Sequence, residues 1–97
     1  MVTPKASRQD YEKFEALYEA NYKPIYAYIY RRVPHSASDV PDVVSEVFAT
    51  AWRRISDLPP APQDRLWLFG VARNCLLGHH RRWSHGTAVD LVDSFGV

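Results

Sequence analysis

The chain has little cysteine and no long hydrophobic run. Cys75 is the one cysteine among 97 residues, which excludes an internal disulfide framework and is typical of proteins from a reducing cytoplasm. No apolar stretch approaches the roughly 20 residues needed to cross a bilayer, and residues 1–7 show no signal-peptide core. These absences predict a small cytoplasmic domain without membrane association.

The composition that is present indicates one folded domain. A hydrophobic fraction of 46% is ordinary for a globular protein, and the length allows one domain but not two. The net charge of +1 conceals an uneven distribution. Residues 65–82 hold four arginines, two histidines and no acid, whereas residues 39–46 hold three acids and no base. Such segregation suggests two different partners, one of them an anionic polymer.

The first of three predicted helices runs from Ser7, an N-cap together with Asp10, to Val33. Pro24 should kink this helix or split it in two. Seven residues recur within one helical stripe and are interpreted as the core-facing side: Tyr11, Phe14, Tyr18, Tyr22, Ile25, Ile29 and Val33.

A turn over residues 34–37 precedes the second helix, predicted from residue 38 or 39 to Ile55. Pro41 falls in its first turn, where a missing N–H costs little. Its expected buried face consists of Val40, Val44, Val47, Phe48, Ala51 and Ile55.

Three prolines exclude helix from residues 56–63 and predict a stiff loop there. The third helix follows over residues 64–83. Its expected core face holds Leu68, Val71, Ala72, Cys75 and His79, and its opposite face holds Leu66, Gly70, Arg73, Asn74, Leu77, His80 and Arg81.

One face of the second helix is acidic. Asp39 and Asp42 are explained by the helix dipole, which stabilises first-turn acids by about 0.3–1 kcal/mol. Glu46 lies nearly two turns in, where this effect has faded. From the residues alone, a docking surface and a solvated acidic face are both open interpretations.

One face of the third helix is basic: Arg73, Asn74, His80 and Arg81 share it, and no acid lies between residues 65 and 82 to neutralise them. Arginines such as Arg73 and Arg81 suit phosphates and base edges, Asn74 can pair with adenine, and Gly70 allows close backbone approach. Three aromatic residues of the kind that stacks on bases accompany them: Trp67, Phe69 and Trp83. This pattern favours a nucleic-acid surface over a solvated cationic helix.

Catalysis and metal binding have weaker support. Cys75 and His79 share one helix at a spacing of four, and His35, His80 or His85 could add ligands, but no second ligand pair or carboxylate set accompanies them. No nucleophile elbow, phosphate-binding glycine loop or triad is evident. We expect neither an enzyme nor a cofactor.

Three stretches in order resemble region 2 of the sigma-70 superfamily, in its extracytoplasmic-function (ECF) branch. Residues 14–18 and 26–33 look like the opening helices, and residues 42–48 and 51–54 are similar to the most recognisable stretch. Residues 67–74 and 80–82 look like the promoter-recognition helix. Pro41 and Ser45 stand where the family usually has glutamate and glutamine.

The resemblance implies an all-α bundle of three to four helices, with a Pro-rich loop before the recognition helix. It implies docking on the β′ clamp coiled coil of core RNA polymerase and recognition and opening of the promoter −10 element, where a base of the non-template strand is flipped into a pocket. The resemblance also admits an anti-sigma factor as a partner. The implied polymerase contacts are Asp39, Asp42, Ser45 and Glu46. The expected DNA contacts are Leu58, Gln63, Arg65, Arg73, Asn74, His80, Arg81 and Arg82.

The expected organisation is a tail over residues 1–9, the region 2 domain over residues 10–83 and a linker over residues 84–97. The family carries a second helical domain, a helix-turn-helix called region 4, which is expected to be absent from this chain. A second hypothesis is a helical interaction module that occupies the clamp without reading DNA. A third, more remote, is a helical DNA-binding regulator that acts without polymerase.

Overall fold

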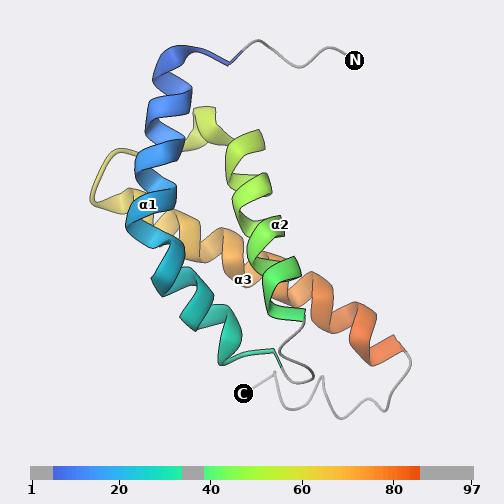
Figure 1. Cartoon of the computed structure of the whole chain (residues 1–97). Helices are drawn as coiled ribbons and strands as arrows, with labels where there is room; N and C mark the ends of the chain where they lie inside the picture. The colour runs from blue at the N-terminus through green and yellow to red at the C-terminus, as the bar shows by residue number, and fades with distance from the viewer. Residues whose placement is uncertain (1–5, 34–38, 86–97) are drawn as a thin grey trace, which may run out of the picture.

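The fold is a bundle of helices around one core. The computed structural model describes residues 6–33 and 39–85, and in this part of the chain it contains α-helices, one 3-10 turn and no strand. The elements in order are α1 (Arg8–Tyr30), α2 (Asp39–Arg53), η1 (Ile55–Asp57) and α3 (Gln63–His85). Helices α1 and α2 lie side by side and α3 crosses behind them (Figure 1), and each helix contacts the other two. The all-α prediction is confirmed.

Parts of the sequence-based prediction fall outside these residues, namely positions 1–5 of the expected tail, the turn at 34–37 and positions 86–97 of the expected linker. The helix of α3 reaches His85 and so enters that expected linker by two residues. Among the helices described, none combines the length and apolar character that a membrane crossing requires.

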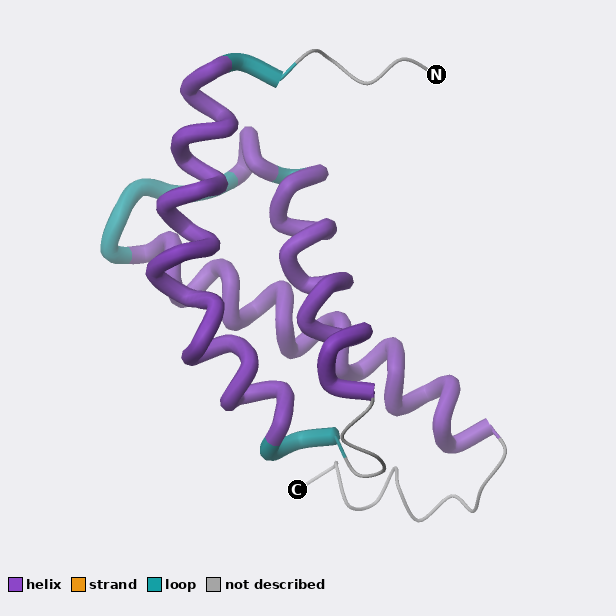
Figure 2. Tube along the Cα trace, viewed as in Figure 1, coloured by secondary structure: helices purple, strands orange, loops and turns teal. Residues whose placement is uncertain are grey.

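Helix α1 begins with a capping box. The Ser7 hydroxyl accepts a hydrogen bond from the Asp10 N–H at 3.0 Å, and the Asp10 carboxylate accepts one from the Ser7 N–H at 3.2 Å. Pro24 lies inside this single helix, which Figure 2 draws without a break. Of the two predicted effects, a kink or a split, the split is therefore wrong. The helix persists because Leu17 on one side of the proline and Ile25 and Ile29 on the other are all buried against the same core.

The stripe of α1 that the spacing predicted as the core face is only partly buried: Phe14, Ile25, Ile29 and Val33 lie in the core or pack against it, and three tyrosines do not. Tyr11, Tyr18 and Tyr22 are exposed, at 60%, 40% and 38%. Their rings cover the seam between α1 and α2: Tyr18 lies 4.7 Å from Phe48 and Tyr11 lies 5.0 Å from Trp52, measured between ring centroids. Tyrosine tolerates this position because one end is apolar while the hydroxyl can stay hydrated. Ile25 and Ile29, from the same predicted stripe, are fully buried.

The predicted core faces of the other two helices are largely confirmed. Every residue assigned to the buried face of α2 is buried, and Val43, which was not assigned, joins them. Helix α2 ends at Arg53, and Ile55 opens the 3-10 turn instead. The predicted loop is therefore shorter than expected and spans residues 58–62. In α3, burial of Leu68, Val71, Ala72 and Cys75 matches the prediction.

Two glycines lie inside α3 at positions where a larger side chain would fit. A methyl group added at Gly78 or at Gly70 would meet nothing within 4 Å. Because glycine costs a helix interior about 0.8–1 kcal/mol relative to alanine, Gly78→Ala should raise the free energy of unfolding by about that amount. For a domain of this size the melting temperature should rise by about 4–8 °C. An unchanged or lower melting temperature would contradict the prediction. Gly70→Ala should stabilise the fold similarly, which makes it a matched variant for DNA-binding assays.

Candidate protein-binding and nucleic-acid-binding surfaces

The four predicted polymerase contacts all lie on α2, and none of them belongs to its buried core residues. Asp42 and Ser45 are exposed, and Asp39 and Glu46 are partly buried. Asp39 and Asp42 occupy the first turn of the helix, where the positive end of the helix dipole stabilises acids. The structure therefore presents the carboxylate of Asp42, beside the Ser45 hydroxyl, as the most accessible part of this face.

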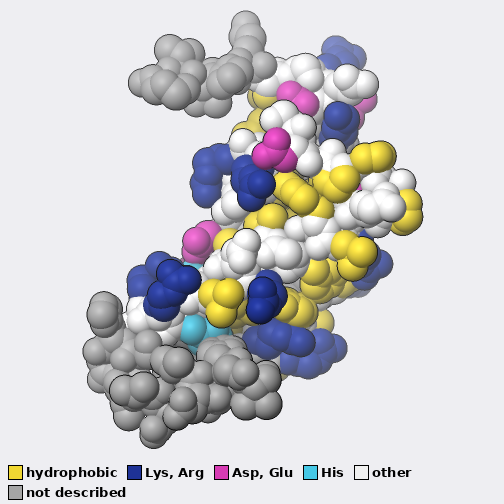
Figure 3. All heavy atoms as spheres, turned by 180° about the vertical axis from the view of Figure 1, so that it is seen from behind, with side chains coloured by type: hydrophobic (Ala, Val, Ile, Leu, Met, Phe, Trp, Pro, Cys, Tyr) yellow, Lys and Arg dark blue, Asp and Glu magenta, His cyan; other side chains and the backbone are white. Residues whose placement is uncertain are grey.

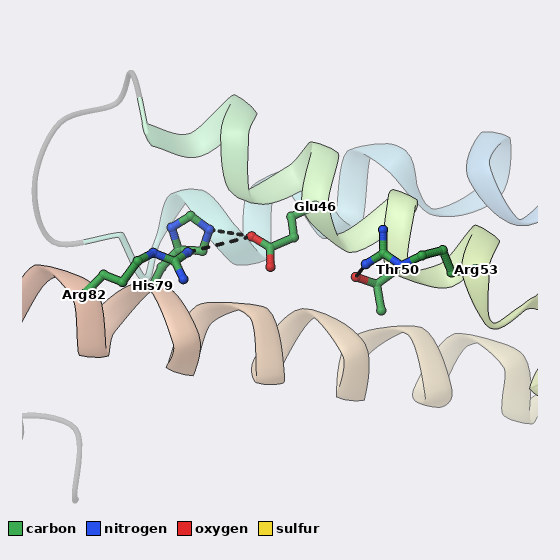
Figure 4. A network of polar contacts seen from close by, with 5 residues as sticks. All are labelled: Glu46, Thr50, Arg53, His79 and Arg82. Atoms are coloured by element: carbon green, nitrogen blue, oxygen red, sulfur yellow. Dashed lines mark hydrogen bonds and ion pairs between the residues drawn. The ribbon is translucent and has the colours of Figure 1, made fainter. Parts of the chain in front are cut away.

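Glu46 differs from its neighbours because it is held by α3. Its Oε1 accepts a hydrogen bond from His79 Nε2 at 2.7 Å and lies 3.9 Å from Arg82 Nη2. Figure 4 shows both side chains converging on this one carboxylate oxygen from α3. The expectation of an acidic face without neutralising partners is thus wrong for Glu46. Sequence periodicity treats each helix separately, so it could not reveal a partner 33 residues away.

The predicted basic face of α3 is present over most of its length. Arg65, Arg73, Asn74, Arg81 and Arg82 are exposed. In the described part of the chain, neither Arg65 nor Arg73 has a carboxylate oxygen within 4.0 Å. On the face where α3 runs (Figure 3), Lys and Arg side chains flank hydrophobic ones. This arrangement suits an anionic partner with exposed apolar surfaces, as nucleobases have.

His80 does not belong to that face. The residue is 5% exposed, so the prediction that it lies on the outer face of α3 is wrong, and it offers little surface for a DNA contact. The reason lies in the helical spacing: His80 comes four residues after Leu76 and eight after Ala72, both buried, and therefore continues the inner side of the helix. His79, predicted to face the core, has a side chain that is only 15% exposed and that bonds to Glu46 of α2.

The aromatic residues expected to stack on bases are less accessible than predicted. Trp67 and Phe69 are partly buried against the core, and the side chain of Trp83 lies outside the described part. Leu66, at 75% exposure, is the most exposed large hydrophobic residue among those described. Any stacking by Trp67 or Phe69 would use only a ring edge or a part of a face.

A cleft lies between α1 and the Pro-rich loop. Its volume is about 480 Å³, large enough for a flat organic ring system. Leu58 also packs against the hydrophobic core, which anchors the loop, while Gln63 is exposed at the first position of α3. The lining residues include Lys13, Leu17, Asn21, Leu58, Pro59, Pro60, Ala61 and Asp64.

Asn21 is a lining residue that the sequence reasoning missed. Its side chain is 4% exposed, and its Nδ2 donates a hydrogen bond to the Leu17 carbonyl at 3.0 Å. Within the described part of the chain its Oδ1 has no hydrogen-bond partner. A signal existed in the sequence: Asn21 lies four residues from both Leu17 and Ile25, at a core position of the helix. A polar residue there is costly unless it has a partner or a function.

Cys75 is buried, as predicted for a structural thiol. Burial raises the pKa of the Cys75 thiol and the Glu46 carboxylate adds to the rise, while a hydrogen bond with Thr50 and the charge of Arg53 act in the opposite direction. Among the described residues, no three His, Cys, Asp or Glu side chains are grouped so that they could hold a metal ion.

The thiol should therefore react slowly in the folded protein. We expect labelling of Cys75 by a thiol reagent to be much slower at neutral pH in the native state than in urea. The thiol of Cys75 has a higher pKa in the folded than in the unfolded chain, so burial of the protonated thiol favours the folded state. This stabilisation is complete below the ordinary thiol pKa of 9.0 and is lost as the pH rises through the folded pKa. The urea midpoint should accordingly fall in the alkaline range, and Cys75→Ala should remove that part of the decline. Equal labelling rates in both states would contradict burial.

The comparison with protein families gives one match that covers most of the chain. The model of the family described as Sigma-70 region 2 matches residues 17–85. That range contains α2, η1, all of α3 and the greater part of α1. No curated protein and no solved structure matches the chain.

Proposed function

Because the chain belongs to the sigma-70 region 2 family, a part of RNA polymerase sigma factors and not an enzyme class, we propose that it is the promoter-opening domain of an ECF sigma factor. In this role it docks on the β′ clamp coiled coil of core RNA polymerase. It then recognises the −10 element and holds the non-template strand open. An anti-sigma factor that covers either surface would be a natural regulator.

The observation that carries this proposal is the segregation of charge onto two helices. Asp42 is exposed on the first turn of α2, and Arg65 and Arg73 are exposed on α3, where no carboxylate oxygen of the described residues lies within 4.0 Å of either. A basic coiled coil and an anionic nucleic acid are complementary to these two surfaces respectively. One small domain can therefore contact both partners at once, as opening a promoter within the polymerase complex requires.

The cleft beside the Pro-rich loop supports the assignment of this loop as the reader of sequence. Pro59, Pro60 and Ala61 form one wall, and α1 forms the other. Prolines restrict the backbone of the loop, so less conformational entropy is lost when a base enters. An extruded base is typically bound between apolar walls and recognised by a few polar groups, and Asn21 and Asp64 supply polar groups here.

Docking is assigned mainly to Asp42 and Ser45, with Asp39 at the edge. Glu46 contributes less than the sequence implied, because His79 and Arg82 already share its charge. Through these contacts Glu46 also fixes the C-terminal half of α3 against α2. The phosphate contacts assigned to Arg81 and Arg82 thus lie on a segment whose position depends on the docking helix.

The experiment that tests the proposal measures binding of a fluorescent −10 non-template oligonucleotide to core polymerase, with and without this chain. Binding should require both proteins. Arg81→Ala and Arg82→Ala should weaken binding to all sequences alike and reduce the salt dependence, as expected for phosphate contacts. If the chain binds core polymerase but never supports oligonucleotide binding, the interaction module that does not read DNA is the correct description.

A further inference from the structure

A strip of arginines and aromatic rings joins α3 to the end of α1. The Arg65 guanidinium lies 5.9 Å from the centroid of Phe69. The Phe69 ring meets Tyr28 of α1 edge to face, with centroids 5.1 Å apart. The Arg32 guanidinium, just after α1, lies 3.9 Å from the centre of the Tyr28 ring. The two cations are therefore linked by two rings that contact each other across the interface between the helices.

The cations at the two ends of this strip are exposed, and among the described residues neither forms an ion pair with an acid. Arg32 and Arg65 are both exposed, and no carboxylate oxygen of the described residues lies within 4.0 Å of either guanidinium. Asp64 is beside Arg65 in sequence, but its carboxylate accepts a hydrogen bond from the Arg65 backbone N–H at 2.8 Å. The positive charge of the strip is thus available to an external anion.

Arg32 is held in place before any ligand arrives. Its Nη1 donates a hydrogen bond to the Tyr28 carbonyl at 3.2 Å, and its guanidinium makes a cation–π contact with the ring of the same tyrosine. Two contacts reduce the rotamer entropy that the side chain would lose on binding. The remaining N–H donors suit the oxygens of a phosphate.

We propose that Arg32 is a phosphate contact for promoter DNA, and that the DNA-binding surface extends from α3 across Phe69 and Tyr28 onto the end of α1. This inference rests on the proposed function, because it assumes that α3 binds DNA within the polymerase complex. DNA is the favoured partner because the strip is continuous with the exposed cations of α3, Arg65 among them. It adds to the site a residue from outside α3 and the loop.

Arg31 offers a matched control at the neighbouring position. It is also exposed and also bonds the carbonyl four residues earlier, with Nη1 3.4 Å from the Ala27 oxygen. Its side chain, however, lines a groove beside Tyr26 and Tyr30, and no residue of the strip lines that groove. Replacing Arg31 or Arg32 by glutamine removes the same charge from the same helix end, and only Arg32→Gln breaks the strip.

The test measures the affinity of core polymerase carrying this chain for a double-stranded promoter fragment at several salt concentrations. Arg32→Gln should reduce the slope of log affinity against log salt by about 0.9, the value for one lost phosphate contact on duplex DNA. Arg31→Gln should leave the slope near that of the parent, and Arg32→Lys should retain most of it. Circular dichroism should show equal helix content in all variants. Equal slopes for Arg31→Gln and Arg32→Gln would overturn the proposal.

The outcomes distinguish a failure of this proposal from a failure of the proposed function on which it rests. If the parent complex does not bind the fragment, the proposed function fails and Arg32 has no DNA role. If Arg81→Ala and Arg82→Ala change the slope while Arg32→Gln does not, the proposed function stands and the strip is not part of the site. If Arg32→Gln instead weakens binding to core polymerase without DNA, the strip contacts protein and the DNA assignment is wrong.

Discussion

Asp42→Lys is expected to weaken binding to core RNA polymerase strongly while leaving the helical fold intact. Asp42 is exposed on the first turn of α2, and in the described part of the chain no cation lies within 4.0 Å of its carboxylate. Loss of one partner from a buried charge pair at an interface costs about 2–5 kcal/mol, and a reversed charge adds repulsion. Affinity should fall roughly thirtyfold or more, as measured by co-sedimentation or interferometry with purified core.

The control for this variant is Glu12→Lys, which makes the same charge change at an exposed position on α1. It should bind core polymerase as the parent does. Glu46→Lys is a poorer choice, because a lysine there would face His79 and Arg82 and disturb α3 as well. If Asp42→Lys and the parent bind core polymerase equally, α2 is not the docking helix.

The second large effect is expected on base preference. Substitution of Gln63 or Asn74 by alanine, or replacement of the loop at residues 58–62, should change which −10 sequence is preferred. Each lost base contact should cost about 1–3 kcal/mol at one position. Gln63 and Asn74 are exposed on α3, and residues 58–61 of the loop line the cleft against α1. Selection from a randomised −10 oligonucleotide pool by the polymerase complex would reveal the shift.

A matched comparison distinguishes residues that contact bases from residues that contact the DNA backbone. Arg81→Ala and Arg82→Ala should lower recovery of the whole pool without altering its composition. Gly70→Ala should weaken binding without destabilising the fold if DNA approaches the backbone closely there, since its added methyl group meets no protein atom. Loop variants that lower affinity uniformly, with no change in base composition, would refute the role of the loop as reader.

The helices themselves could largely be predicted because their signals are local. The capping box at Ser7 and the apolar spacing of α2 each depend on residues within one helix, and both are confirmed. Pro41 in the first turn of α2 was equally predictable from backbone chemistry. The boundaries differed by one to three residues, as at Arg53, where a 3-10 turn replaces the predicted last turn.

The errors arise where the outcome depends on how helices meet. Tyr18 has the spacing of a core residue, yet its ring covers a seam between helices because its hydroxyl allows exposure. His80 has the chemistry of a DNA contact, but α3 packs so that this position faces inward. The partners of Glu46 depend on the relative position of α2 and α3, which no single helical pattern contains.

Photo-crosslinking to a −10 non-template oligonucleotide, after co-purification with core polymerase, tests directly whether this domain opens promoters. The chain should co-purify with core polymerase. Crosslinks should form through α3 or residues 58–62 to the unpaired strand, should be far stronger than to closed duplex and should depend on core polymerase. Failure to co-purify, or crosslinks of equal strength to closed duplex in the absence of polymerase, would contradict the proposed function.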